Sequence, residues 1–378
     1  MRLTMLLLAL ILLCSCARAE ETMTLHAVNV GKADALILRC GEHAYLIDTG
    51  TEESWGRLSC ALKINGITRL DGVIVTHTDD DHGGGCAALS QSSVEIGAWY
   101  APVWYTCKES KHPVINAAAL RDQKVVWLEQ GMTLPLGDGM LTVLGPVEED
   151  PDKENNNSLV LLAEGGDGSI LLAGDMEMPE EESLLERRLI PRADVLKVGN
   201  HGEGDATSLT LVSQVKPKVA VISTNTEEEP DTPDEDVLRN LSRVGAKVLQ
   251  TQDSDAGVLV SIRGGSISAD NVRYTAIPEK AGRARIVQKG EDDSVTLRCD
   301  GSSALDLTDW FIRSERGGEV FVFPAGTVLE PGAEIIVSSK SSDRDGDLVW
   351  PDKSIWHKNK DDAAVLYDPY GREMHRLP

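Results

Sequence analysis

One segment constrains this chain more than any other, because an apolar strand runs directly into a cluster of potential metal ligands. The segment reads Val73-Ile-Val-Thr-His77-Thr-Asp79-Asp-Asp81-His82-Gly-Gly-Gly85, so two histidines and three aspartates fall within six residues. Imidazoles and carboxylates together hold divalent metals and leave positions open for water. The glycines let the backbone turn tightly behind them. A solvated acidic turn is the alternative. The block predicts the ligands of a dinuclear metal site.

Three further apolar strands are followed by polar residues of the same kind. They read Leu46-Ile-Asp48-Thr-Gly50, Leu171-Leu-Ala-Gly174-Asp175 and Leu196-Lys-Val-Gly-Asn200-His201-Gly202. Each alone is weak evidence, since Asp and Gly commonly finish strands. Four such strand ends in one chain indicate that their side chains share a site.

Length and charge limit what surrounds this site. A chain of 378 residues has room for two or three domains. With 61 acidic and 37 basic side chains, its formal charge is -24. Such acidity repels phosphate backbones, which argues against a protein that coats DNA. A polyanionic substrate would need metal ions or a local basic surface.

The N-terminus reads as an export signal. An apolar run from Leu3 to Leu13 is too short to span a bilayer, and Ala17-Arg18-Ala19 is typical of a cleavage site. We expect a signal peptide over 1–19, a secreted or extracytoplasmic protein, and no transmembrane domain in the mature chain. The alternative is a lipid anchor at Cys16. Five cysteines then remain, and they form no CxxC motif: Cys40, Cys60, Cys86, Cys107 and Cys299. One or two disulfides among them are possible.

The remaining chain divides into two structural regions. Over 20–276, strand-like runs such as 23–30, 70–76 and 195–198 alternate with helical patterns at 55–65, 180–188, 209–215 and 234–244, which predicts an α/β domain. Residues 277–283 form an expected linker. Residues 284–378 are nearly free of helical pattern and predict a small β-sandwich.

The order of the motifs resembles a known family. Ile47-Asp-Thr-Gly50, the His77–His82 block, Asn155-Asn-Asn-Ser158, Gly174-Asp175 and His201-Gly202 are similar to the metallo-β-lactamase fold. With the opening Val28-Asn-Val-Gly31-Lys-Ala-Asp34 they resemble, more narrowly, the exported hydrolase domain of the competence protein ComEC. The resemblance covers roughly residues 22–264. It implies an αββα metallo-β-lactamase sandwich.

The resemblance also implies a ligand set. His77, Asp79 and Asp175 would hold one divalent ion, and Asp81, His82, Asp175 and His201 a second. Zn²⁺ and Mn²⁺ are both candidates, because Asp79 and Asn157 stand where the broader fold has histidines. Asp81 or Asp175 would orient the attacking water. Asp48 would support the ligand loop. Asn155, Asn157 and Ser158 would be supporting or substrate contacts, or only a turn before a strand.

One departure concerns the reaction. The ComEC-like branch usually carries HHG where this chain has Asn200-His201-Gly202. Asn200 cannot titrate, but its amide can donate a hydrogen bond to a developing oxyanion, so Asn200 is a third catalytic candidate. We expect Lys197, on the preceding strand, to be structural or solvent-facing.

The last hundred residues resemble the lamin-tail domain, a small immunoglobulin-like sandwich. The resemblance rests on Trp310, Phe321-Val-Phe-Pro324 and Asp361-Asp-Ala-Ala-Val-Leu366 with their Pro-Gly turns. We expect Trp310, Phe321, Phe323 and Leu366 in its core. Trp350 and Trp356 are either an exposed binding edge or part of a packed loop.

Two functions follow from different classes. The first is an exported dinuclear metallohydrolase acting on a phosphodiester, either nucleic acid or a phosphorylated surface polymer, with the last domain binding a cell-surface ligand. The second is a non-catalytic, metal-stabilised scaffold acting through that domain, for which Asn200 is the best support. A β-lactamase is a third option, from whose ligand pattern the block departs.

Overall fold

The computed structural model describes residues 21–105, 111–275, 277–279, 282–357 and 360–378. The expected signal peptide, Cys16 and Cys107 lie outside these residues. In the described part, no helix is long and apolar enough to cross a membrane. Cys40, Cys60, Cys86 and Cys299 are buried free thiols.

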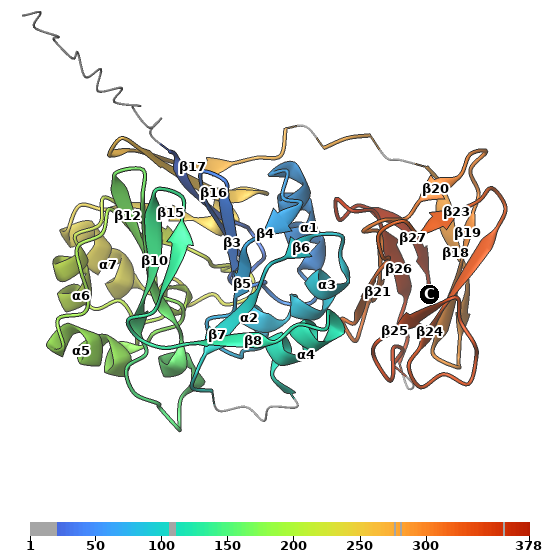
Figure 1. Cartoon of the computed structure of the whole chain (residues 1–378), viewed down its shortest axis with the longest axis horizontal. Helices are drawn as coiled ribbons and strands as arrows, with labels where there is room; N and C mark the ends of the chain where they lie inside the picture. Colours follow the sequence, from blue (N-terminus) through green and yellow to red (C-terminus); the bar gives the residue numbers. More distant parts are fainter. Residues whose placement is uncertain (1–20, 106–110, 276, 280–281, 358–359) are drawn as a thin grey trace, which may run out of the picture.

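Two mixed sheets pack face to face in the first domain (Figure 1). Within the described residues, the first sheet has the order β17 (Ser266–Val272), β16 (Gly257–Arg263), β1 (Met23–Ala27), β2 (Leu36–Cys40), β3 (His43–Ile47), β5 (Gly72–Ile74), β7 (Trp99–Pro102) and β8 (Val125–Leu128). The second has the order β15 (Lys247–Gln250), β14 (Val219–Ile222), β13 (Val195–Lys197), β12 (Gly168–Leu172), β11 (Val160–Gly165), β10 (Gly139–Gly145) and β9 (Thr133–Leu136). A continuous apolar core fills the space between the two sheets.

Helices cover the outer face of each sheet, which completes an αββα sandwich. The first sheet carries α1 (Trp55–Ile64), α3 (Cys86–Gln91) and α4 (Pro113–Leu120), and the second carries α5 (Met178–Glu186), α6 (Leu209–Val215) and α7 (Glu235–Arg243). Helix α1 buries Trp55, Leu58 and Leu62, a spacing that places them on one helical face. The Asp234 side chain caps α7 by accepting from the Asp236 N–H. A short ladder of β4 (Arg69–Leu70) and β6 (Glu95–Ile96) lies beside the first sheet.

Strand direction brings the polar strand ends together. β3, β5 and β7 run parallel in the first sheet, and β12, β13 and β14 run parallel in the second. Parallel strands present their carboxyl ends at one edge, where α/β folds usually bind ligands. Asp48 follows β3, the His77 block follows β5, Asp175 follows β12, and His201 follows β13.

The second domain is an all-β sandwich. One sheet has the order β18 (Ala284–Gly290), β19 (Ser294–Cys299), β24 (Glu334–Ser339) and β25 (Leu348–Trp350); the other has the order β22 (Val320–Val322), β21 (Phe311–Ser314), β26 (Ala364–Tyr367) and β27 (Glu373–Leu377). A two-stranded ladder joins β20 (Leu305–Asp306) and β23 (Val328–Leu329). The core contains Trp310, Phe321, Phe323 and Leu366 as expected. Trp350 and Trp356 are also buried there, so the exposed binding edge was the wrong alternative.

The second domain packs against the helices of the first (Figure 1). Phe311, Val320 and Val322 lie in the same apolar cluster as α1 and α3. Burial of such side chains contributes roughly 1.5–3 kcal/mol each. Between the domains, β17 ends at Val272 and β18 begins at Ala284.

Candidate metal centre

The loop after β5 is anchored by a buried carboxylate. Asp48 accepts hydrogen bonds from the Thr76 backbone N–H at 2.7 Å and from the Thr76 hydroxyl at 2.8 Å. The same carboxylate lies 2.8 Å from Nδ1 of His82, which belongs to the short helix α2 (Asp80–Gly83). The second ring nitrogen of His82 therefore faces the second sheet. Asp48 thus orients a histidine, which is the support that metal-binding histidines commonly have.

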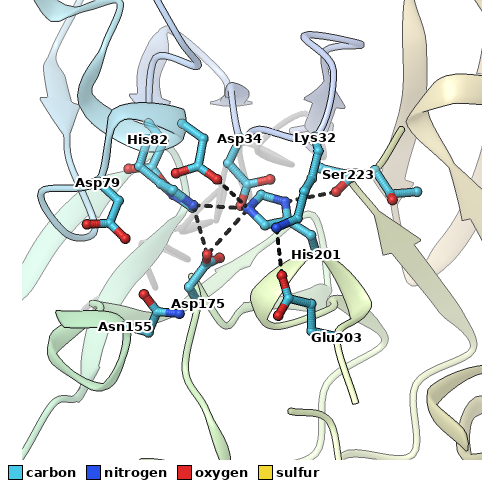
Figure 2. Close-up of polar contacts among 12 residues, drawn as sticks. Lys32, Asp34, Asp79, His82, Asn155, Asp175, His201, Glu203 and Ser223 are labelled. Atoms are coloured by element: carbon cyan, nitrogen blue, oxygen red, sulfur yellow. Dashed lines mark hydrogen bonds and ion pairs between the residues drawn. The ribbon is translucent and has the colours of Figure 1, made fainter. Parts of the chain in front are cut away.

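Four side chains from the two sheets meet at one point (Figure 2). Oδ2 of Asp175 lies 3.1 Å from Nε2 of His82 and 3.3 Å from Nε2 of His201. Nε2 of His201 is also 3.3 Å from Oδ2 of Asp81. Each of the four residues offers one ligand atom, and these atoms lie within 4.8 Å of one another.

His77 and Asp79 lie beside this cluster. Nδ1 of His77 contacts the Ser158 hydroxyl at 3.2 Å, and its Nε2 is 3.7 Å from Oδ2 of Asp79. Ser158 also accepts from the Asp175 backbone N–H at 3.1 Å, so it positions two of the expected ligands at once. Nε2 of His77 and Oδ1 of Asp175 are buried and have no hydrogen-bond partner among the described residues.

The charges at the centre perturb one another strongly. Burial alone would lower the pKa of His201, but the carboxylates of Asp175 and Asp81 outweigh burial and raise that pKa to about 10. Burial also opposes a charge on His82, yet Asp175 and Asp48 hold its pKa well above the ordinary value. For Asp175, burial would raise the pKa, but His201 and His82 hold it well below the usual range. The imidazoles and carboxylates therefore stabilise each other's charged forms.

The donor set fits divalent metal. Buried nitrogen and oxygen atoms without partners cost free energy, and here one such atom belongs to Asp175 of the four-residue cluster and the other to His77, whose ring centroid is 4.1 Å from that of His82. Carboxylates and imidazoles are present in equal number, a mixture suited to zinc or manganese. His77, Asp79, Asp81, His82, Asp175 and His201 are the residues that could hold metal.

The three asparagine and serine candidates before β11 have different surroundings. The short helix η2 (Glu154–Asn157) carries the asparagines. Asn157 is fully buried, and its amide bonds the backbone of Asp150 in both directions, at 2.8 Å each. Asn155 donates to Glu177, two residues after Asp175, at 3.1 Å. Asn157 therefore stabilises its own loop, while Asn155 connects that loop to the segment that follows Asp175.

Asn200 is held at the start of the His201 turn, η3 (Asn200–Gly202). Its amide nitrogen donates to Oδ1 of Asp205 at 3.1 Å, and the residue is buried. Asn200 and His201 both have positive φ, of 44° and 51°. Nδ1 of His201 lies 2.9 Å from the Ser223 carbonyl oxygen, which fixes the ring orientation.

Asp34 and Lys197 are charged residues close to the centre that were not among the candidate site residues. Lys197 is fully buried, which excludes the solvent-facing alternative, and its Nζ lies 2.7 Å from Oδ2 of Asp34. Burial would raise the pKa of Asp34, but Lys197 and His201 lower it. Asp34 belongs to the opening motif Val28–Asp34, and its membership of that motif was the signal in the sequence that could have marked it as a site residue. Lys32, from the same motif, pairs with Glu203 at 2.6 Å and Glu229 at 2.7 Å (Figure 2).

Comparison with known proteins agrees with this geometry. The family model described as Metallo-beta-lactamase superfamily matches residues 28–226, more than half of the chain. The chain belongs to the metallo-beta-lactamase superfamily. Membership supports a metal-dependent hydrolase that uses divalent ions. The model described as Lamin Tail Domain matches residues 278–378, which confirms the second resemblance.

Three relatives of this chain are named as ComE operon, recombination or competence proteins. ComE operon protein 3 of Bacillus subtilis is 29% identical over 269 residues, covering 66% of this chain and 34% of that protein. Recombination protein 2 of Haemophilus influenzae is 30% identical over 242 residues, covering 62% and 28%. Competence protein ComA of Neisseria gonorrhoeae is 27% identical over 252 residues, covering 65% and 33%. The chain spans about a third of the length of these relatives.

Proposed function

We propose that this chain is an exported, dinuclear metal-dependent phosphodiesterase. One observation carries the proposal: Asp175 offers Oδ2 to the cluster of Asp81, His82 and His201, while its buried Oδ1 is unpartnered among the described residues. A carboxylate with two such oxygens can bridge two cations. His77 and Asp79 would complete the set for the other ion of the pair. Paired divalent ions activate water and stabilise both oxygens of an in-line displacement at phosphorus.

The chain's own residues would then orient rather than attack. Asp48 and Ser223 hold the two histidine rings in place, and Asp81 contacts His201 at the centre. Asp81 or Asp175 would orient the attacking water. The amide nitrogen of Asn200 already donates a hydrogen bond to Asp205. We therefore propose that Asn200 shapes the turn and does not donate to an oxyanion.

The surrounding charge bears on the substrate. Asp79, Asp80, Glu203 and Glu229 are acidic side chains in the same region, and Lys32 is paired to two of them. A phosphodiester would therefore be held by the metal ions and not by a basic groove. Nucleic acid and a phosphorylated surface polymer both remain within this proposal, as does recognition of a cell-surface ligand by the lamin-tail domain. Export through residues 1–19, or anchoring at Cys16, belongs to the same proposal.

Hydrolysis of simple phosphodiesters tests the function directly. Residues 20–378 would be assayed with Mn²⁺ or Zn²⁺ on bis-p-nitrophenyl phosphate and single-stranded DNA, beside a lactam reporter. We expect phosphodiester turnover that falls roughly 100-fold or more in Asp81→Ala. The matched control is Asp80→Ala, which removes the exposed neighbouring carboxylate and should retain turnover.

Each other result has a meaning. Lactam cleavage alone would replace the phosphodiesterase by a β-lactamase. Equal turnover in Asp81→Ala and the parent would assign the activity to a contaminant. Silence on every substrate with both ions bound would favour the non-catalytic scaffold.

A further inference from the structure

A buried ion pair joins the two sheets beside the metal centre. Asp34 lies in the loop between β1 and β2 of the first sheet, and Lys197 is the last residue of β13 in the second. Their Oδ2 and Nζ atoms are 2.7 Å apart, and both residues are fully buried. A buried charge is strongly unfavourable unless it is paired, so each residue fixes the place of the other.

The backbone of Asp34 contacts the loops that carry the first sheet's ligands. Its N–H donates to the Asp81 carbonyl oxygen at 3.1 Å, and its carbonyl oxygen accepts from the Gly50 N–H at 2.7 Å. Gly50 ends the turn that begins at Asp48, the residue that orients His82. A displacement of Asp34 would therefore move both the Asp81 loop and the Asp48 turn.

Lys197 acts on the second sheet in the same way. Its Nζ donates to the Val198 carbonyl oxygen at 2.9 Å, two residues before Asn200. Val198 continues the ladder to β14 through its N–H, which donates to the Val221 carbonyl oxygen at 2.9 Å. The lysine thus ties the start of the His201 turn to Asp34 on the opposite sheet.

We propose that Asp34 and Lys197 are positioning residues whose ion pair sets the spacing between Asp81 and His82 on one sheet and Asp175 and His201 on the other. The inference rests on metal binding at the proposed centre. The pair makes the centre's affinity for metal depend on two residues that contact no metal themselves.

A direct ligand role for Asp34 fits the contacts less well. Asp34, Asp48 and His82 do offer atoms within 4.8 Å of one another. However, Oδ2 of Asp34 is engaged by Lys197, and Oδ2 of Asp48 is engaged by Thr76 and His82. A cation among these three would also face the buried ammonium of Lys197.

Removing both charges together tests positioning apart from folding. Asp34→Asn combined with Lys197→Met leaves no lone buried charge, and such neutral replacements often preserve stability. Metal affinity would be measured for Mn²⁺ by electron paramagnetic resonance and for Zn²⁺ by competition with a chromogenic chelator. The thermal midpoint of the chelator-treated protein would be measured in parallel. Lys218→Met, in the exposed Lys218–Asp194 pair of the same sheet, is the control.

We expect the double variant to keep its metal-free thermal midpoint within a few degrees while its metal affinity falls roughly 10- to 100-fold. The control should bind metal as the parent does. Unchanged affinity in the double variant would overturn the inference. If that variant does not fold, Asp34→Glu is used, which keeps the charge and displaces it by one methylene. A loss of metal affinity in Asp34→Glu would then support the inference, and unchanged affinity would overturn it. Turnover is not used, so a parent that binds metal without phosphodiesterase activity would refute only the proposed function.

Discussion

The turn at Asn200 and His201 places two consecutive non-glycine residues in the left-handed region. Each such residue costs free energy, though asparagine pays less than most because its short amide can bond locally. Here the Asn200 amide does so with Asp205. The asparagine that departs from the family pattern therefore has a conformational reason at this position.

Replacing Asn200 with alanine should lower stability more than its size suggests. The variant loses a buried hydrogen bond and gains backbone strain, which together amount to about 2 kcal/mol of unfolding free energy. Urea denaturation of the metal-free protein would measure this. A loss below a few tenths of a kcal/mol would show that Asp205 and the left-handed turn contribute little.

Metal binding at the centre should release protons. Because the carboxylates raise the pKa of His201 to about 10, this ring is protonated at neutral pH until a metal ion replaces the proton. Affinity should therefore rise with pH from 6 towards 10. Calorimetric titration in buffers of different ionisation enthalpy would count the protons. A binding enthalpy that is independent of the buffer would contradict this prediction.

At the scale of elements, the ends of the parallel strands carried most of the predictive signal. The expected helix at 209–215 coincides with α6, and the expected strand ends are the positions from which Asp48, Asp175 and His201 reach the centre. These predictions agree with the structure because periodic burial and polar residues at strand ends are local properties of the sequence. The strands β17, β18 and β27 were not predicted, because their residues are half exposed and form no long apolar run.

Pairings between distant segments could not be predicted in the same way. The Asp34–Lys197 pair joins positions 163 residues apart, from 34 to 197, on different sheets. The sequence around either residue does not indicate that the other is its partner. For Asn157 the sequence left two alternatives, a supporting or substrate contact or a turn before a strand, and only the hydrogen bonds of its amide to the backbone of its own loop favour the turn. The register of one sheet against another decides such contacts.

A buried carboxylate adds to the contact between the lamin-tail domain and the first domain. Asp309, 1% exposed, accepts from the Ser93 N–H at 2.6 Å and pairs with Lys63 at the end of α1. Asp309→Ala should therefore cost about 3 kcal/mol of unfolding free energy. Glu330→Ala, an exposed change in the same domain, should cost almost nothing. Chemical denaturation of both variants compares them, and equal stability would exclude a role for Asp309 in docking.

For the molecule as a whole, the contact between domains should respond to pH. Glu52 accepts from the Val320 N–H at 2.9 Å across this contact. Burial, opposed by that hydrogen bond and reinforced by Asp352 and Glu319, raises the Glu52 pKa to about 8. The folded state therefore holds a proton that the unfolded chain releases above about pH 4.3.

The sign follows from this proton count. The contribution of Glu52 to stability is present at low pH and is lost as pH rises towards 8, beyond which it changes no further. Glu52→Gln should flatten this part of the curve. Thermal midpoints of the metal-free parent and variant between pH 5 and 9 provide the comparison, and parallel curves would show that Glu52 does not control the contact.

The two sheets contribute different members of the four-residue cluster at the centre, so an ion bound there would hold the two halves of the first domain together. Any protein stabilised in this way opens more often when the ion is scarce, since bound ligand adds to the free energy of unfolding. Opening of the sandwich would expose its central apolar layer to proteases. We therefore expect the lifetime of this protein to follow the supply of metal in its surroundings, which would make its abundance a record of that supply.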